Sequence, residues 1–328
     1  MSEVRALRDA GDRHEVPEID VGPLVRGDDA TAAADVAAAI DRACREVGFF
    51  CIVGHGVDPA RRERLDRAAR AFFARPEAEK AEIAMARAGR AWRGWFPLGG
   101  ELTAGVPDRK EGLYFGQELG PDHPRVRAGT PLHGANLFPA EPADLRPAVL
   151  DWLDALTRLG QVVLRGIALG LGRPASWFAD DLTADPLVLF RIFRYPPVAA
   201  TPDAGPGGEA WGVGEHTDYG LLTLLAQDGN PGLEVKTPGG WVAVDPRPDA
   251  FVCNLGDMLA RLSGGRYVST PHRVRNRSGA ERLSFPFFLD PGWDAVVDPA
   301  TGGTYGDYIL AKVRAVFPAL AQATVGEA

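Results

Sequence analysis

The pattern of hydrophobic and polar positions changes near residue 186. Before that point, apolar residues recur mainly at helical spacing. Over 144–171 they fall on one helix face, with Pro147 in the first turn and the tripeptide GLG at the end. After Pro186, short apolar runs alternate with turn-forming residues, which is typical of a barrel or sandwich of short antiparallel strands. The pattern therefore predicts an α+β protein with helices packed outside a barrel-like core.

Local signals mark several element boundaries in the first half. Asp29 is suited to cap a helix that ends at Gly48, and Asp58 followed by Pro59 is suited to begin another. The sequence GFFCIVGHGV between them predicts a short strand. The segment 89–122 is rich in glycine and aromatic residues without a steady period. We expect it to form a long ordered loop or two short strands that cover a site.

The second half contains seven candidate strands. We expect one domain over 1–328, made of a mainly helical portion (15–180), a strand-rich core (186–292) and a C-terminal helical segment (293–328) with a helix over 308–317. The candidate strands are LVLFRIFRY, LLTLLAQ, GLEVK, WVAV, FVCNL, HRVRN and RLSFPFFL.

Composition narrows the class of protein. The net charge of −8 argues against nucleic acid and anionic membranes as partners. The cysteines, Cys44, Cys51 and Cys253, lie among apolar neighbours without zinc-site spacing, so we expect buried reduced thiols. We find no signal peptide and no apolar run long enough for a membrane span, and we expect a cytoplasmic protein without an obligate protein partner.

Three residues have the chemistry of a metal site. His216 and Asp218 stand two apart in HTDYGLLTLL, so on a strand both would face the same side. Such a pair alone is more often an inert surface feature. His272 lies several predicted strands later, and a barrel can bring distant strands together. Two histidines and one carboxylate form the facial triad of non-haem Fe(II) oxygenases. Zinc hydrolases also use three protein ligands, so the three residues alone do not distinguish iron from zinc.

A second pair stands ten residues beyond His272. Arg282 and Ser284 also occupy alternate positions, in an otherwise apolar run. A lone arginine there requires an anionic partner. A dicarboxylate cosubstrate would satisfy it, with a hydrogen bond from the serine, and the alternative is an internal salt bridge to Asp257. A site for a dicarboxylate cosubstrate favours iron over zinc. Three protein ligands leave three coordination positions free on iron, which suffice for a keto acid and O2, whereas a zinc hydrolase needs only one position for water.

Together these motifs resemble the iron/2-oxoglutarate-dependent dioxygenases of the isopenicillin N synthase-like family. The segments VPEIDVGPL, GFFCIVGHGV, AFFARPEAEK, RYPP, EHTDYGLLTLL, NLGDML and STPHRV are similar to family segments and stand in the same order. The resemblance implies a double-stranded β-helix (jelly-roll) core with N-terminal helices outside it and a C-terminal helix. It also implies Fe(II) on His216, Asp218 and His272, with O2 as co-reactant.

The resemblance further implies that Arg282, Ser284 and Tyr195 of RYPP hold the distal carboxylate of 2-oxoglutarate. One position departs from the pattern, because many plant members carry asparagine where this chain has Phe193. The isopenicillin N synthase branch keeps the arginine and the serine but uses no 2-oxoglutarate.

Substrate contacts are expected from three regions. Segments 92–100 and 107–116 correspond to the mouth of the barrel in the family. Arg191 and Arg194 differ in parity, so only one can face inward, and it would hold a substrate carboxylate or form a salt bridge. Asp108 and Glu111 are expected in a solvated loop. The candidate pocket residues are Arg93, Trp95, Lys110, Tyr114, Arg191, Leu224, Phe287 and Phe288.

The leading hypothesis is an Fe(II)/2-oxoglutarate-dependent dioxygenase. It would hydroxylate an unactivated C–H bond of a small molecule, such as a secondary metabolite, and release succinate and CO2. One alternative is a 2-oxoglutarate-independent iron oxidase or cyclase of the isopenicillin N synthase type. The other is a barrel that binds a ligand or metal without turnover.

Overall fold

The structure of the protein is a computed structural model, and it describes residues 15–103, 105–197 and 211–316. Its centre is an eight-stranded sheet, antiparallel except where its first two strands pair. In order across the sheet, the strands are β1 (Glu18–Asp20), β2 (Phe49–Val53), β12 (Phe251–Leu255), β9 (Leu222–Gln227), β14 (Arg282–Asp290), β7 (Leu187–Tyr195), β6 (Glu111–Gly116) and β3 (Gly94–Phe96).

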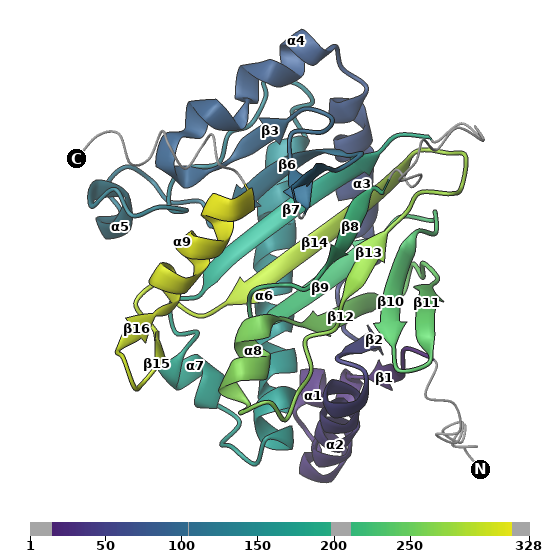
Figure 1. Ribbon diagram of the computed structural model, residues 1–328, viewed down its shortest axis with the longest axis vertical. Coiled ribbons are helices and arrows are strands. Elements are labelled where there is room, and N and C mark those ends of the chain that lie inside the picture. Colours follow the sequence, from purple (N-terminus) through teal and green to yellow (C-terminus); the bar gives the residue numbers. More distant parts are fainter. Residues whose placement is uncertain (1–14, 104, 198–210, 317–328) are drawn as a thin grey trace.

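A second, four-stranded sheet lies on the front of the first (Figure 1). Two short hairpins complete the strands that the described residues form. The four-stranded sheet has the order β11 (Gly240–Val244), β10 (Leu233–Thr237), β13 (His272–Val274) and β8 (Val213–His216). The hairpins pair β4 (Leu102–Thr103) with β5 (Val106–Pro107), and β15 (Val296–Asp298) with β16 (Gly303–Thr304).

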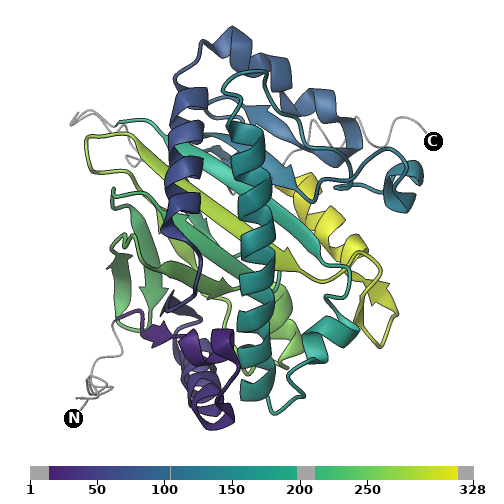
Figure 2. The same cartoon turned by 180° about the vertical axis from the view of Figure 1, so that it is seen from behind.

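Helices cover the opposite face of the large sheet, and two long helices cross its back (Figure 2). Those two are α3 (Pro59–Phe73) and α6 (Leu145–Gly170). The remaining helices are α1 (Gly22–Arg26), α2 (Ala30–Glu46), α4 (Glu77–Lys80), α5 (Pro124–Arg127), α7 (Trp177–Asp181), α8 (Asp257–Leu262) and α9 (Tyr305–Val316), with 3₁₀ turns η1 (Ala81–Ile83) and η2 (Met85–Ala91).

The predicted helix boundaries are confirmed at three places. The side chain of Asp29 accepts hydrogen bonds from the backbone amides of Thr31 and Ala32, and Asp58 caps α3 in the same way. Pro147 lies in the first turn of α6. The closing helix begins at Tyr305, three residues earlier than predicted, and its predicted end at Phe317 lies outside the described residues.

All seven predicted strands are present, but the portion 15–180 is less purely helical than expected. It contributes β1, β2, β3 and β6 to the large sheet. The segment 89–122 forms β3 and β6 with the β4–β5 hairpin between them, so its reading as short strands is confirmed. The three cysteines are unpaired. Among the residues described, no helix is both long and apolar enough to cross a membrane.

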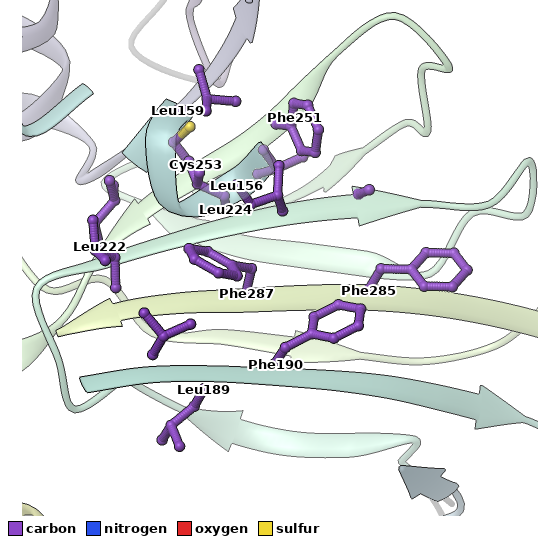
Figure 3. Packing of buried hydrophobic residues seen from close by; sticks show 14 of the residues in the cluster. Leu156, Leu159, Leu189, Phe190, Leu222, Leu224, Phe251, Cys253, Phe285 and Phe287 are labelled. Carbon is purple, nitrogen blue, oxygen red and sulfur yellow. The ribbon is translucent and has the colours of Figure 1, made fainter. Parts of the chain in front are cut away.

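The core lies between the large sheet and α6. Leu224, Phe285 and Phe287 point from the sheet toward Leu156 and Leu159 of α6 (Figure 3). The helix can come this close because Gly160 has no side chain, and a Cβ there would lie 2.7 Å from a methyl carbon of Leu289. Since side chains alternate along a strand, every second residue of β9, β14 and β7 is left to face the four-stranded sheet. Those positions form the site.

Candidate functional site

His216, Asp218 and His272 meet between the two sheets. His216 ends β8, His272 begins β13, and the two strands pair antiparallel with these two residues opposite each other. One potential ligand atom from each of the three residues lies within 4.8 Å of the others. The prediction that these residues share one site is therefore geometrically consistent, but its reason was partly wrong. Asp218 lies in the loop after β8, not on a strand beside His216.

Backbone carbonyls orient both imidazoles. The Nδ1 of His216 lies 2.8 Å from the carbonyl oxygen of Gly214, and the Nδ1 of His272 lies 3.2 Å from that of Thr270. Each Nδ1 therefore donates its proton to a carbonyl, and each Nε2 keeps a free lone pair. The Nε2 atoms lie 3.9 Å and 3.8 Å from Oδ1 of Asp218. This leaves two nitrogens and one oxygen converging on one point.

The carboxylate of Asp218 is fixed by two neighbouring side chains. Thr223 Oγ1 donates to its Oδ2 at 2.5 Å, and Asn254 Nδ2 donates to the same oxygen at 2.7 Å. Burial opposes ionisation of Asp218, but His272, His216 and these two hydrogen bonds outweigh it and lower the pKa of the carboxyl. Burial also lowers the pKa of His272 to about 4. At neutral pH, Asp218 and His272 are thus in the protonation states in which metals bind them.

Arg282 is fully buried in the same cavity. Its Nη2 donates to Oε1 of Gln227 at 3.0 Å, and its Nε donates to the carbonyl oxygen of Asn230 at 3.3 Å. Its Nη1 is buried without a hydrogen-bond partner among the described residues. The alternative of a salt bridge to Asp257 is wrong, because Asp257 pairs with Lys312 at 3.3 Å. A buried guanidinium with an unused donor fits an anionic ligand.

Ser284 and Tyr195 lie beside this arginine. The Ser284 hydroxyl is 3.4 Å from the Tyr195 hydroxyl, and the guanidinium carbon of Arg282 lies 4.9 Å from the centre of the tyrosine ring. Both residues line the cavity. The three residues expected to hold the cosubstrate are therefore neighbours.

The cavity has a volume of about 530 Å³, which suits a small organic molecule. Of the predicted pocket residues, Lys110, Arg191 and Phe288 line it. Leu224 and Phe287 instead face the core with α6, as alternation requires of residues one position from Thr223 and Phe288. Counting parity outward from Ser284 would have selected Phe288 and rejected Phe287.

Three other predicted pocket residues lie outside the cavity lining. Arg93 is buried elsewhere and donates to the carbonyl oxygen of Leu132 at 2.7 Å. Trp95 donates its indole N–H to Glu111 at 2.9 Å. The hydroxyl of Tyr114 donates to Glu101 at 2.5 Å, so this tyrosine supports a cavity residue.

The two arginines of β7 face opposite sides, as their parity predicted. Arg191 lines the cavity, whereas Arg194 pairs with Glu111 at 2.6 Å and with Glu281 on the other face.

The expectation of a solvated loop at Asp108 and Glu111 is wrong. Both carboxylates are buried, and they pair with Lys110 at 2.8 Å and Lys80 at 2.7 Å, respectively.

Sequence reasoning missed several polar residues of the site. Asn254 carried a signal, since it is the one polar residue of the candidate strand FVCNL. Thr223 and Gln227 lie in the run LLTLLAQ at the same parity, which could also have been noticed. Glu101 and Asp290 also line the cavity, but no pattern in the sequence distinguishes them from other acidic residues.

Comparison with known proteins agrees with this geometry. Residues 16–141 match the N-terminal family described as non-haem dioxygenase in morphine synthesis, and residues 186–291 match the 2OG-Fe(II) oxygenase superfamily. A probable iron/ascorbate oxidoreductase of Dictyostelium discoideum is 43% identical over 86% of this chain and 88% of its own length. A homoarginine-6-hydroxylase of Arabidopsis thaliana is 34% identical over 94% of this chain and 99% of its own.

A solved structure gives the same result. The crystal structure of a full-length Neurospora crassa protein in complex with alpha-ketoglutarate (2-oxoglutarate) has a TM-score of 0.75 and 29% sequence identity. The match covers 90% of this chain and 92% of that one. The chain therefore belongs to the isopenicillin N synthase-like 2OG-Fe(II) oxygenases, and these matches support a non-haem iron enzyme with 2-oxoglutarate as its cosubstrate.

Proposed function

We propose that this enzyme hydroxylates a C–H bond of a small molecule at an iron held by His216, Asp218 and His272. The observation that carries the proposal is the shared cavity, in which these residues lie together with the unused Nη1 of Arg282. Bound Fe(II) would supply the chemistry that couples O2 and 2-oxoglutarate to oxidation of the substrate, with hydroxylated product, succinate and CO2 as the products.

The residues of this chain bind and orient the reactants. The carbonyls of Gly214 and Thr270 hold the imidazoles with Nε2 toward the metal position, and Thr223 and Asn254 hold the carboxylate. Such outer contacts keep the ligands in place before the metal arrives. Three protein ligands leave room at the metal for a bidentate keto acid and for O2.

We propose that Arg282, Ser284 and Tyr195 bind the distal carboxylate of 2-oxoglutarate. The buried guanidinium has one donor without a partner among the described residues, and two hydroxyls stand beside it. Gln227 is neutral, so it orients the guanidinium without neutralising its charge. Phe193, which stands where many plant members carry asparagine, lines the cavity without supplying a polar atom, so the proposed binding of the carboxylate rests on Arg282, Ser284 and Tyr195 alone.

We further propose that the described residues, 15–103, 105–197 and 211–316, belong to the one catalytic domain expected over 1–328, and that the two sheets are the layers of a double-stranded β-helix. Residues from both sheets line a single cavity, which supports this reading. The strands contributed by the first half of the chain lie within the large sheet, so the helical portion has no separate core in the described residues.

Consumption of 2-oxoglutarate tests the proposal without knowledge of the substrate. We expect this enzyme to decarboxylate the cosubstrate slowly even when no substrate is present. The purified protein with Fe(II), O2, 2-oxoglutarate and excess ascorbate, which supplies the two electrons that the absent substrate would give, should therefore release succinate and CO2 in equal amounts, and Asp218→Asn should abolish the release. Iron binding without any succinate would instead favour the oxidase that takes its electrons from the substrate alone. Failure to bind iron would favour a barrel without turnover.

A further inference from the structure

Arg191 is a cation in the cavity without an ion-pair partner among the described residues. Its guanidinium carbon lies 4.0 Å from the ring centre of Tyr114 and 4.8 Å from that of Phe288, so two aromatic rings hold it in place. Its Nε is buried without a hydrogen-bond partner in the described part of the chain. Arg194, three residues along the same strand, has two glutamate partners.

Outside the triad, each carboxylate of the cavity wall has a partner other than Arg191. Glu101 pairs with Lys110 at 2.9 Å, and Glu215 pairs with Lys236 at 2.9 Å. Asp290 accepts a hydrogen bond from the backbone amide of Leu221 at 3.0 Å. Burial acts to raise the pKa of Glu101 and of Asp290, and the positive charge of Arg191 acts to lower both. Within residues 15–103, 105–197 and 211–316, however, neither carboxylate forms an ion pair with Arg191.

Arg191 is also separate from the cosubstrate position. Arg282 stands opposite Tyr195 in the pairing of β14 with β7, and Arg191 lies four residues from Tyr195 along β7. At about 3.3 Å per residue, the two backbone positions are roughly 13 Å apart. The cavity can therefore hold one anion at Arg282 and a second, independent anion at Arg191.

The wall around Arg191 is largely apolar. Leu102, Phe193, Tyr219, Phe288, Ile309 and Val313 line the cavity. Lys110, the other cation on this side, is neutralised by Glu101 and Asp108. We propose that the substrate is a small carboxylic acid with an apolar body, and that Arg191 binds its carboxylate. This inference rests on the proposed function, because it assigns the substrate of the same iron site.

Competition between acids and their amides tests the inference. The probes are a set of aromatic and aliphatic monocarboxylic acids, each with its primary amide, which has nearly the same shape but no charge. They are titrated into the anaerobic enzyme with Fe(II) and saturating 2-oxoglutarate, so that Arg282 is already occupied. Binding is followed by the change in the visible charge-transfer band of the iron–keto-acid complex and, independently, by the shift in the midpoint of thermal unfolding.

We expect at least one acid to bind tenfold or more tightly than its amide, because a charge-assisted bidentate pair contributes at least about that factor. Arg191→Met should remove the preference, Arg191→Lys should keep part of it, and Arg194→Met, which changes the other face of the strand, should leave it intact. The inference is overturned if no acid binds ahead of its amide, or if the preference survives in Arg191→Met. If the band does not form before any acid is added, the proposed function fails instead, and the thermal shift alone decides the acid preference.

Discussion

The two faces of the eight-stranded sheet differ sharply in chemistry although they are built from the same strands. Along β14, Leu283, Phe285, Phe287 and Leu289 are fully buried and apolar, and they face α6 or its surroundings. The residues between them, from Ser284 to Asp290, line the cavity. The comparison teaches that a shift of one position along the strand separates residues that hold the fold together from residues that serve the reaction.

Phe287 and Phe288 should therefore respond very differently to truncation. Phe287→Ala should lower the free energy of unfolding by about 3 to 5 kcal/mol, because it leaves a cavity in a close-packed core. Phe288→Ala enlarges an existing cavity and should cost less than about half of that. Denaturant unfolding of both variants measures the difference, and equal losses would contradict the separation of the two faces.

Arg282→Met should affect the cosubstrate rather than stability. We expect the KM for 2-oxoglutarate to rise roughly 10- to 150-fold, since hydrogen bonds to charged groups contribute about 1.5–3 kcal/mol. The free energy of unfolding of the empty protein should not fall, because the guanidinium is buried without an anionic partner in the described residues. A large loss of stability with an unchanged KM would assign Arg282 to the fold.

Asn254 and Cys253 offer the same comparison on β12. Asn254→Ala removes a hydrogen bond to Asp218 and should weaken Fe(II) binding about 10- to 100-fold. Cys253→Ala changes a buried thiol in the core cluster and should leave iron affinity unchanged. Anaerobic Fe(II) titration of the two variants measures this, and equal affinities would show that the second hydrogen bond, from Thr223, suffices.

The two arginines of β7 should show the smallest effect. Arg194→Met leaves Glu111 and Glu281 without one of their partners, and it should lower the free energy of unfolding by about 1 kcal/mol, given that the arginine is partly exposed. Arg191→Met removes a cation that has two ring contacts but no ion-pair partner among the described residues, so it should lower the free energy of unfolding by less than Arg194→Met does. Thermal unfolding of both variants measures the two stability losses. A larger loss in Arg191→Met than in Arg194→Met would make Arg191 a structural residue.

Sequence patterns predicted the elements better than the contacts between them. Caps at Asp29 and Asp58 and the seven apolar runs after Pro186 are local signals, and each corresponds to an element of the structure. Pairing is not local. That β3 and β6 extend the sheet beside β7 depends on contacts made by a segment with no steady period.

The site divides in the same way. His216, Asp218, His272, Arg282 and Ser284 were selected because their side chains are chemically conspicuous in apolar surroundings. The apolar wall was assigned less well, because phenylalanine suits the core and the cavity equally, and only parity separates Phe287 from Phe288. The predictions for Arg93 and Trp95 were wrong because the fold of segment 92–116 decides which of its side chains turn inward.

The central claim is that the triad and Arg282 together hold iron and 2-oxoglutarate in one cavity. The most direct test is the visible absorption of the anaerobic protein with Fe(II) and 2-oxoglutarate, with His216→Ala and Arg282→Ala beside it. We predict the weak metal-to-ligand charge-transfer band of a bidentate keto acid in the wild type. It should be lost in His216→Ala and require much more 2-oxoglutarate in Arg282→Ala. Iron binding without the band in the wild type, or a band that neither substitution changes, would contradict the account.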